Sequence, residues 1–343
     1  MRIAILLMDR CIGSGIHSLV DSMIATNYTL VKSEQNPVFE WNTVSIDGRA
    51  VMPTNGLGIQ PDYSLEEYVQ LETCPDVWIF PSVFHSSTAY SKVEQALLMA
   101  EPIIPVIQQH YDRGGLLISI CSGSFLLARA GLLNSLPALM HWKSEPHFRR
   151  MFPRLKIDTH NAIADYGNII CAIGGGSACE HLVMYLVERF IGHRAAVDTA
   201  KLLMMHLNPP PPQPFRSNAE TTEHADELVL RAQRHIEKNS NQEVDFGGLS
   251  DMLNISDRQL NRRFMKVLHC SPLQYLQTIR INRACNLLEL TQLPSSKIVY
   301  QVGYKDESSF RRLFKKQMEM TMESYRQKFG RRKTGSDNGT VMV

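Results

Sequence analysis

Residues 244–268 read VDFGGLSDMLNISDRQLNRRFMKVL, and their spacing decides the architecture of the last third of the chain. The apolar face of a first short helix consists of Leu249, Met252 and Leu253. Asn254 and Ile255 supply a tight turn, and Ser256 is placed to cap a second helix. The apolar side of that second helix holds Leu260, Phe264 and Val267. Two short helices joined in this way predict a helix-turn-helix unit.

The same pattern returns in SSKIVYQVGYKDESSFRRLFKKQ, at residues 295–317. Its first helix carries Ile298, Val299 and Val302, and its second helix buries Phe310, Leu313 and Phe314. Gly303 and Tyr304 form the turn between them. A repeated supersecondary unit is a strong architectural signal. We therefore predict an all-α domain with two helix-turn-helix units in tandem.

The opposite faces of the two second helices carry groups that suit DNA. The first unit presents Arg258, Asn261, Arg262 and Lys266, and the second presents Lys305, Ser308, Ser309, Arg311, Arg312, Lys315 and Lys316. Arginine bonds guanine bidentately, asparagine bonds adenine, and further basic groups neutralise phosphates. One such helix alone is better explained as a solvated face, but two matched units favour the major groove of double-stranded DNA as the partner.

Charge is distributed unevenly along the 343 residues, whose formal net charge is +2. Residues 1–218 hold 16 Lys and Arg against 19 Asp and Glu, whereas residues 256–333 hold 17 against 6. A basic segment beside a slightly acidic one predicts a polyanionic partner for the C-terminal part only.

The proline-rich segment NPPPPQPF, residues 208–215, marks the place where the chain divides. Proline lacks the backbone donor and has a restricted φ, so this segment is expected to be an extended spacer. We predict an α/β domain over residues 1–207 and a linker over 208–220. The helical domain then covers residues 221–330, and a disordered tail follows over 331–343.

Before the linker, short apolar runs alternate with helical patterns. The runs are RIAILLM at 2–8, VWIFPSV at 77–83, GGLLISI at 114–120 and NIICAI at 168–173. Strand and helix in alternation predict a mainly parallel sheet with flanking helices. The third run leads directly into Cys121, followed by Ser-Gly-Ser and a helix, and His141 and Trp142 come twenty residues later. A cysteine at a helix N-terminus lies at the positive end of the helix dipole, which stabilises the thiolate form.

Residues from about 225 to 330 resemble the DNA-binding domain of the AraC family, in which a long helix joins two helix-turn-helix units. That helix corresponds to residues 273–291, and the closing element MESYRQKF corresponds to residues 322–329. The family pattern places base readers on Arg258, Asn261, Arg262, Glu307, Ser308, Arg311 and Arg312. The chain departs from the family at three positions, since His269 and Glu319 stand for glycine and Met322 stands for proline.

The strand-CSGS-helix-AGLL pattern, followed by His141 and Trp142, resembles the class I glutamine-amidotransferase-like superfamily and, more closely, regulators of the GlxA type. This resemblance covers nearly the whole chain. It implies a sequence-specific transcriptional regulator, controlled by a small nitrogen-containing metabolite and dimeric through its sheet domain. It also allows RNA polymerase as a further partner.

Three interpretations of Cys121 stay open: a working nucleophile, one side of a ligand pocket, or a small buried residue. Enzymes of the superfamily use a glutamate after the first strand, and Gly15 falls at that position here. We therefore favour a pocket with Cys121 and Ser122 at its floor and His141 and Trp142 on one wall. The chain is then no enzyme, and a cysteine-dependent hydrolase or amidase is the alternative.

Other patterns are interpreted as structural. Gly174–Gly176 is a strand-to-helix turn rather than a nucleotide site, and His181 is an interior histidine rather than a determinant of ligand preference. The seven cysteines are scattered without a CxxC pair, and the histidines show no metal spacing. We expect no cofactor, no metal, no membrane segment and a cytoplasmic, nucleoid-associated protein.

Overall fold

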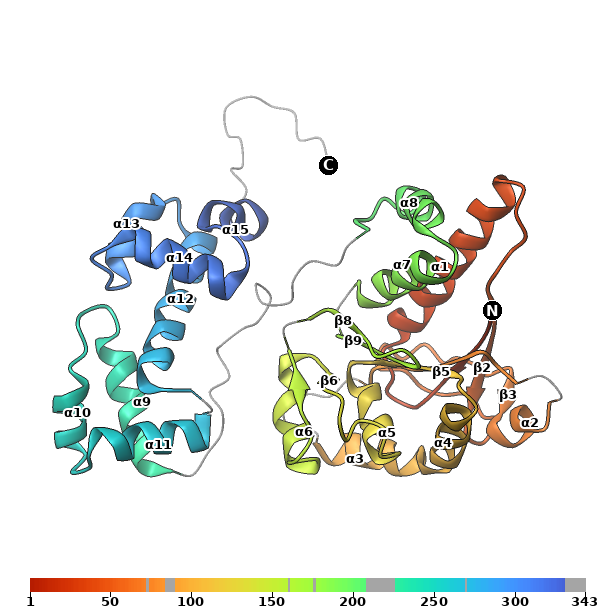
Figure 1. The fold of residues 1–343 in the computed structure, drawn as a ribbon, viewed down its shortest axis with the longest axis horizontal. Coiled ribbons are helices and arrows are strands. Elements are labelled where there is room, and N and C mark those ends of the chain that lie inside the picture. Colours follow the sequence, from red (N-terminus) through yellow and green to blue (C-terminus); the bar gives the residue numbers. More distant parts are fainter. Residues whose placement is uncertain are drawn as a thin grey trace. The chain divides into compact units, whose positions relative to one another are not determined.

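The computed structural model describes residues 1–71, 74–83, 90–159, 161–174, 177–207, 226–268 and 270–330. The chain forms two compact units, Met1–Pro212 and Gln213–Val343 (Figure 1). The division between them falls in the segment predicted as a linker. That linker, the predicted tail at 331–343 and His269 lie outside the described residues.

The first unit is built on a seven-stranded sheet in the order β3-β2-β1-β4-β5-β9-β8. The strands are β1 (Arg2–Leu6), β2 (Glu40–Ser45), β3 (Tyr63–Ser64), β4 (Val77–Phe80), β5 (Leu116–Ile120), β8 (Ile163–Asp165) and β9 (Ile169–Ala172). All adjacent pairs are parallel except β8 with β9. Two short strands, β6 (Ala138–Leu139) and β7 (Ile157–Asp158), pair separately. The predicted mainly parallel sheet is confirmed.

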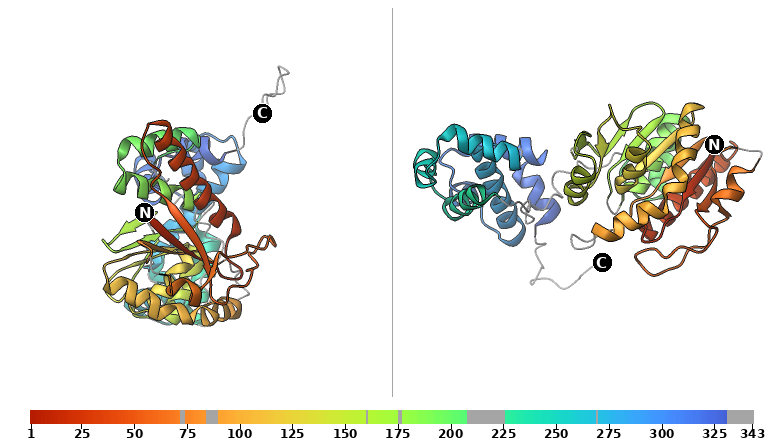
Figure 2. Two further views of the ribbon diagram at one scale, coloured as in Figure 1. Left: turned by 90° about the vertical axis from the view of Figure 1, so that its right-hand side faces the viewer. Right: turned by 90° about the horizontal axis from the view of Figure 1, so that it is seen from below.

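Helices cover both faces of this sheet (Figures 1 and 2). One layer contains α1 (Gly13–Lys32), α7 (Ala178–Phe190) and α8 (His193–Leu202). The other contains α3 (Tyr90–Met99), α4 (Ile104–Asp112), α5 (Ser124–Arg129) and α6 (Glu145–Met151), and α2 (Leu65–Val69) follows β3. Every residue of β4, β5 and β9 is buried, as expected of central parallel strands covered on both sides. The edge strands β3 and β8, and β2 beside β3, are only partly buried, which explains why their apolar pattern was too weak to predict them.

In its described residues the second unit is entirely helical, which agrees with the sequence-based prediction. Its helices are α9 (Glu227–Asn239), α10 (Phe246–Met252), α11 (Asp257–Leu268), α12 (Pro272–Leu290), α13 (Ser295–Gln301), α14 (Glu307–Met318) and α15 (Met322–Phe329). Two apolar clusters form its core, one around Phe264 and the other around Phe310 and Phe314. The long helix α12 contributes Leu276 to the first cluster and Leu288 to the second, so it joins the two helix-turn-helix units.

The turns of the two units follow the predicted positions. Asn254 and Gly303 adopt left-handed backbone conformations, with φ of 54° and 94°. Glu319 ends α14 with a φ of 56°, a conformation that glycine adopts more easily and that accounts for the glycine of the family pattern. One prediction is wrong, because Met252 is 45% exposed and the buried face of α10 rests on Leu249 and is continued by Leu253.

Candidate functional site

Cys121 lies in a strained, tightly packed elbow at the carboxyl end of β5. Its φ is 51°, which is unusual for any residue other than glycine. A Cβ added to Gly123 would lie 2.2 Å from the carbonyl oxygen of Phe80, and one added to Gly174 would lie 2.8 Å from the Cβ of Cys121. Only glycine fits at these two positions, so the loops after β4, β5 and β9 hold the thiol in one place.

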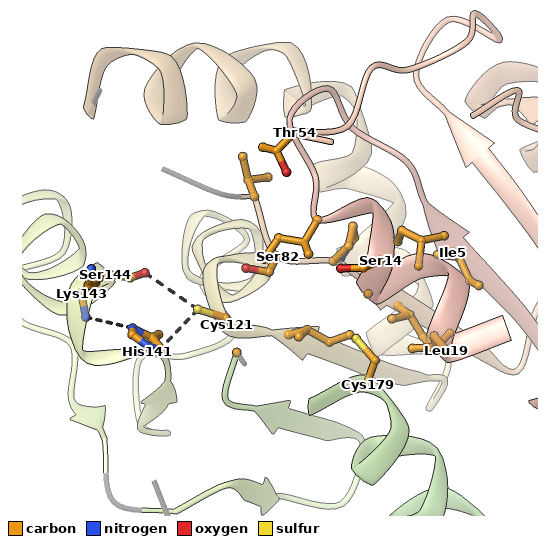
Figure 3. Close-up of a pocket in the computed structure, with 18 residues that line it drawn as sticks. Ile5, Ser14, Leu19, Thr54, Ser82, Cys121, His141, Lys143, Ser144 and Cys179 are labelled. Carbon is orange, nitrogen blue, oxygen red and sulfur yellow. Dashed lines mark hydrogen bonds between the residues drawn. The ribbon is translucent and has the colours of Figure 1, made fainter. Parts of the chain in front are cut away.

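The elbow borders a cavity of about 360 Å³ beside the carboxyl ends of β1, β4 and β5 (Figure 3). Cys121 and His141 line it, as predicted for the pocket. Its other lining residues are Ile5, Ile12, Ser14, Gly15, Ile16, Leu19, Thr54, Ile79, Pro81, Ser82, Val83, Ile120, Lys143, Ser144, Gly174 and Cys179. The carboxyl edge of a parallel sheet is the usual place for a ligand in such folds.

The structure corrects the placement of Ser122 and Trp142, which are not among the described residues that line the cavity. The Oγ of Ser122 accepts a hydrogen bond from the backbone N–H of Val83 at 2.7 Å and lies 3.0 Å from the carbonyl oxygen of Val83. Ser122 therefore ties two loops together. The indole of Trp142 lies beside the ring of His141, with 5.0 Å between ring centres, and under the ammonium of Lys143.

The contacts of the Cys121 thiol come from the segment that follows β6. The backbone N–H of His141 donates to Sγ at 3.4 Å, and the hydroxyl of Ser144 lies 3.8 Å away. The Nδ1 of His141 accepts a hydrogen bond from the backbone N–H of Lys143 at 3.2 Å. This nitrogen is thus engaged with the backbone rather than directed at the thiol as a base.

Gly15, at the position where the superfamily's enzymes carry glutamate, lines the cavity. A Cβ there would lie 3.1 Å from the Sγ of Cys179. Burial raises the pKa of Cys179 to about 12, so this neighbour is a neutral thiol. None of the described lining residues is Asp or Glu.

Two further sequence predictions concern the segment after β9. His181 is buried on α7, where its Nδ1 lies 2.7 Å from the carbonyl oxygen of Ser177, and it does not line the cavity. Gly174 approaches the elbow closely, and the rest of the glycine triplet lies outside the described residues. In the described ranges no group of three His, Cys, Asp or Glu is arranged to hold a metal ion.

The second helix of the first helix-turn-helix unit, α11, presents its polar face to solvent. Arg258, Asn261, Arg262 and Lys266 are all exposed. On the other side, Leu260 and Phe264 are buried. The start of the helix is fixed by reciprocal hydrogen bonds between Ser256 and Gln259, which confirms the predicted cap.

In the second helix-turn-helix unit, Asp306 caps the start of α14, and its carboxylate accepts hydrogen bonds from the backbone N–H groups of Ser308 and Ser309. Hydrogen bonds from the Ser309 hydroxyl and from this backbone lower the pKa of Asp306. Ser308, Arg312 and Lys316 are exposed, whereas Glu307 and Ser309 are half-buried. The polar face of α14 therefore matches that of α11.

Arg311 differs from the other predicted base readers because two acids hold it. Its guanidinium lies 2.8 Å from the carboxylate of Glu323 on α15 and 3.6 Å from that of Glu307. Hydrogen bonding to Glu323 raises the pKa of Arg311. Arg312, the next residue, is exposed on the same helix. Arg311 is thus held by carboxylates whereas Arg312 is exposed, although the sequence predicted the same role for both.

Arg280, which sequence reasoning missed, joins the two helix-turn-helix units. It is only 9% exposed, and its guanidinium donates to the carbonyl oxygens of Ser240 at 2.8 Å and of Gln242 at 2.7 Å. The same guanidinium lies 5.0 Å from the ring centre of Tyr304, in the turn of the second helix-turn-helix unit. Nothing in the spacing of α12 distinguishes this arginine from its neighbours.

A second connection links the start of the helical domain to α11. Asp226, the first described residue after the linker, caps α9 by accepting from the backbone N–H of Val229. Its other carboxylate oxygen lies 2.7 Å from the guanidinium of Arg263. Burial opposes ionisation of Asp226, but these two partners outweigh it, and the pKa of Asp226 is lowered.

Comparison with known proteins matches both units. Residues 249–328 match a family model described as a helix-turn-helix domain. The transcriptional regulator GbdR of Pseudomonas aeruginosa is 25% identical over 289 residues, which cover 81% of this chain and 72% of that protein. The regulator GlxA of Rhizobium meliloti is 26% identical over 214 residues, 62% of this chain and 65% of that protein.

A crystal structure described as a putative transcriptional regulator protein from Vibrio parahaemolyticus is 18% identical, covering 59% of this chain and 98% of that one, with a TM-score of 0.48. No helix in the described ranges is both long enough and apolar enough to cross a bilayer. The chain is a DNA-binding transcriptional regulator in which a domain with a mainly parallel sheet precedes two helix-turn-helix units.

Proposed function

We propose that this regulator reads DNA through α11 and α14, and that a small metabolite in the cavity beside Cys121 controls this binding. The observation that carries the proposal is the pairing of two exposed basic helices, each with a buried opposite face, inside one helical unit. Such helices insert into the major groove, with their first turns toward the bases.

Within this proposal the exposed residues divide by chemistry. Arg258, Asn261 and Arg262 of α11 and Ser308 and Arg312 of α14 are the direct base readers. Lys266 and Lys316 contact phosphates, which adds affinity without sequence information. Glu307, Ser309 and Arg311 lie at the edge of the DNA-binding surface. The ion pairs of Arg311 with Glu307 and Glu323 reduce its contribution to base recognition.

The test uses the full chain and a duplex selected from random sequence by the unmodified protein. Arg262→Ala and Arg312→Ala should each lose about 1–3 kcal/mol of discrimination at particular base pairs, whereas Lys316→Ala should weaken binding evenly across sequences. Competition binding with single-base variants of the duplex measures this. If all three variants behave alike, the division between base readers and phosphate contacts is wrong.

Control by a metabolite requires a ligand whose affinity differs between the DNA-binding and the non-binding state. Thermal-shift screening of the full chain against a metabolite panel identifies candidates, and each is then tested for its effect on DNA affinity. Thr54 is exposed and lines the cavity, so Thr54→Trp fills the cavity without disturbing the core. A ligand that shifts DNA affinity in the unmodified chain and not in Thr54→Trp supports control through this cavity; the lack of any such ligand counts against it.

We also propose that the N-terminal unit catalyses no reaction of its own. The support is the glycine at the acid position and the engagement of the His141 Nδ1 with the backbone. Amide and ester substrates are incubated with the full chain and with Cys121→Ala. Turnover that depends on Cys121 would establish the hydrolase alternative.

A homodimer and contact with RNA polymerase belong to the same proposal. A dimer would present two DNA modules to two half-sites, so the selected duplex should have matching symmetry. Sedimentation of the full chain with and without that duplex tests the dimer, and retention of RNA polymerase on the occupied duplex tests the second contact.

A further inference from the structure

Helix α1 carries a stripe of large apolar side chains on the face that it turns to solvent. Ile24, Tyr28 and Val31 are 49%, 52% and 56% exposed. Residues three and four positions apart on a helix are neighbours, so these three side chains form one continuous stripe. The side of α1 that packs on the sheet is a different one and contains Leu19 and Leu30, both buried. Single exposed apolar residues are normal on a protein surface, whereas a contiguous group of them marks an interaction site.

Helix α8 lies beside α1 and extends this apolar surface. The hydroxyl oxygens of Thr29 on α1 and Thr199 on α8 lie 3.1 Å apart, which places the two helices side by side at this level. One turn beyond Thr199, Leu202 is 47% exposed, and Met204, just after the end of α8, is almost fully exposed. We call Ile24, Tyr28, Val31 and Leu202 the α1-α8 patch.

Charged residues of opposite sign flank the stripe along α1. Asp21 precedes the apolar residues, Lys32 follows them, and both are exposed. The ammonium of Lys32 lies 5.6 Å from the ring centre of Tyr28, so it borders the stripe directly. The two charges are separated by about 16 Å along the helix axis. The exposed face of α1 thus has an acid at one end, apolar side chains in the middle and a base at the other end.

We infer that the α1-α8 patch binds the same patch of a second copy of this chain, with the two α1 helices antiparallel. A two-fold axis pairs a surface with its own reverse, and the acid-apolar-base order is complementary to its own reverse. With the axis at the level of Thr26, Ile24 of each copy meets Tyr28 of the other. Asp21 of each copy then lies beside Lys32 of the other. This inference rests on the homodimer of the proposed function and names the surface that forms it.

The first arm of the test places a charge in the middle of the patch. Ile24 is exposed and glutamate favours helices, so Ile24→Glu should fold. Because two unpaired carboxylates would be buried in the dimer, its dissociation constant should rise about a hundredfold or more in sedimentation equilibrium of the full chain. The matched control is Leu98→Glu, since Leu98 is 55% exposed on α3, in the other helix layer. Leu98→Glu should leave the dissociation constant unchanged.

The second arm reverses the charges at the two ends of the stripe. Asp21→Lys puts two bases opposite each other, and Lys32→Asp puts two acids opposite each other, so each variant should dimerise about tenfold more weakly than the unmodified chain. In an equimolar mixture of the two variants, every acid faces a base. The mixture should therefore form mixed dimers about as tightly as the unmodified chain, and high salt should reduce the differences between all these samples.

The outcomes separate this inference from the proposed function. If the unmodified chain is a dimer and Ile24→Glu dimerises equally well, or if the mixture associates no more tightly than its separate variants, this surface is wrong and the homodimer stands. A chain that stays monomeric at every concentration, with and without the selected duplex, would overturn both the homodimer and this surface and assign the patch to a different protein. Base reading by α11 and α14 is measured independently, with single-base variants of the duplex.

Discussion

Replacing Arg280 by methionine removes the guanidinium that joins the two helix-turn-helix units while keeping most of the aliphatic packing of the side chain. Two hydrogen bonds from the charged group, to Ser240 and Gln242, are lost, together with the contact over the Tyr304 ring. A hydrogen bond to a charged group contributes about 1.5–3 kcal/mol, so we expect Arg280→Met to lower the free energy of unfolding by about 3–5 kcal/mol. This is a large part of the stability of a domain of this size.

The positions of the tryptophans allow the unfolding of the two compact units to be distinguished. Its three tryptophans, Trp41, Trp78 and Trp142, all belong to the first unit. In urea denaturation of the full chain, tryptophan fluorescence therefore follows the first unit, and far-ultraviolet circular dichroism follows both. Arg280→Met should move the dichroism transition to lower urea and leave the fluorescence transition where it was.

Two control variants sharpen this prediction. Arg234→Met removes an exposed arginine from α9 and should cost less than about 0.5 kcal/mol. Arg280→Lys keeps the charge but not the planar fork that reaches two carbonyl groups, so it should recover only part of the loss. If Arg280→Met lowers the free energy of unfolding no more than Arg234→Met does, Arg280 does not hold the two helix-turn-helix units together through its guanidinium. Full recovery of that free energy in Arg280→Lys would have the same meaning.

Three further predictions concern the same unit. Gly303→Ala places a Cβ 2.7 Å from the backbone of the α9-α10 loop at a φ of 94°, so we expect a loss of about 2–3 kcal/mol in the same urea assay, and an unchanged midpoint would refute the close approach. Glu323→Gln removes the acid nearest to Arg311 and should tighten DNA binding with a steeper dependence on salt; equal salt slopes would show that Arg311 stays away from phosphates. Asp226 has a lowered pKa, so its stabilising pair with Arg263 is complete above the ordinary pKa of aspartate, near 3.9, and is lost as the pH falls through the lower folded value. The difference in urea midpoint between the unmodified chain and Asp226→Asn should therefore shrink from about pH 6 to about pH 3, and a constant difference would contradict the ion pair.

Local spacing in the sequence was sufficient to predict most of the architecture. The period of apolar residues predicted the central strands and the helices, and the cap at Ser256 and the turn at Gly303 follow from the chemistry of single residues. Such features depend on neighbours a few positions away, and this is why a sequence reveals them. The weakly patterned edge strands were missed because only their pairing partner defines them.

The tertiary structure decided which side chains meet. Ser122 bonds Val83, 39 positions away, instead of lining the cavity, and Arg280 bonds Ser240, 40 positions away. Sequence reasoning also assigned Arg311 and Arg312 the same role, although a carboxylate from the next helix holds only one of them in the described contacts. Periodicity specifies the face of a helix on which a residue lies, but the partner on that face comes from a distant part of the chain, and only folding brings the two together.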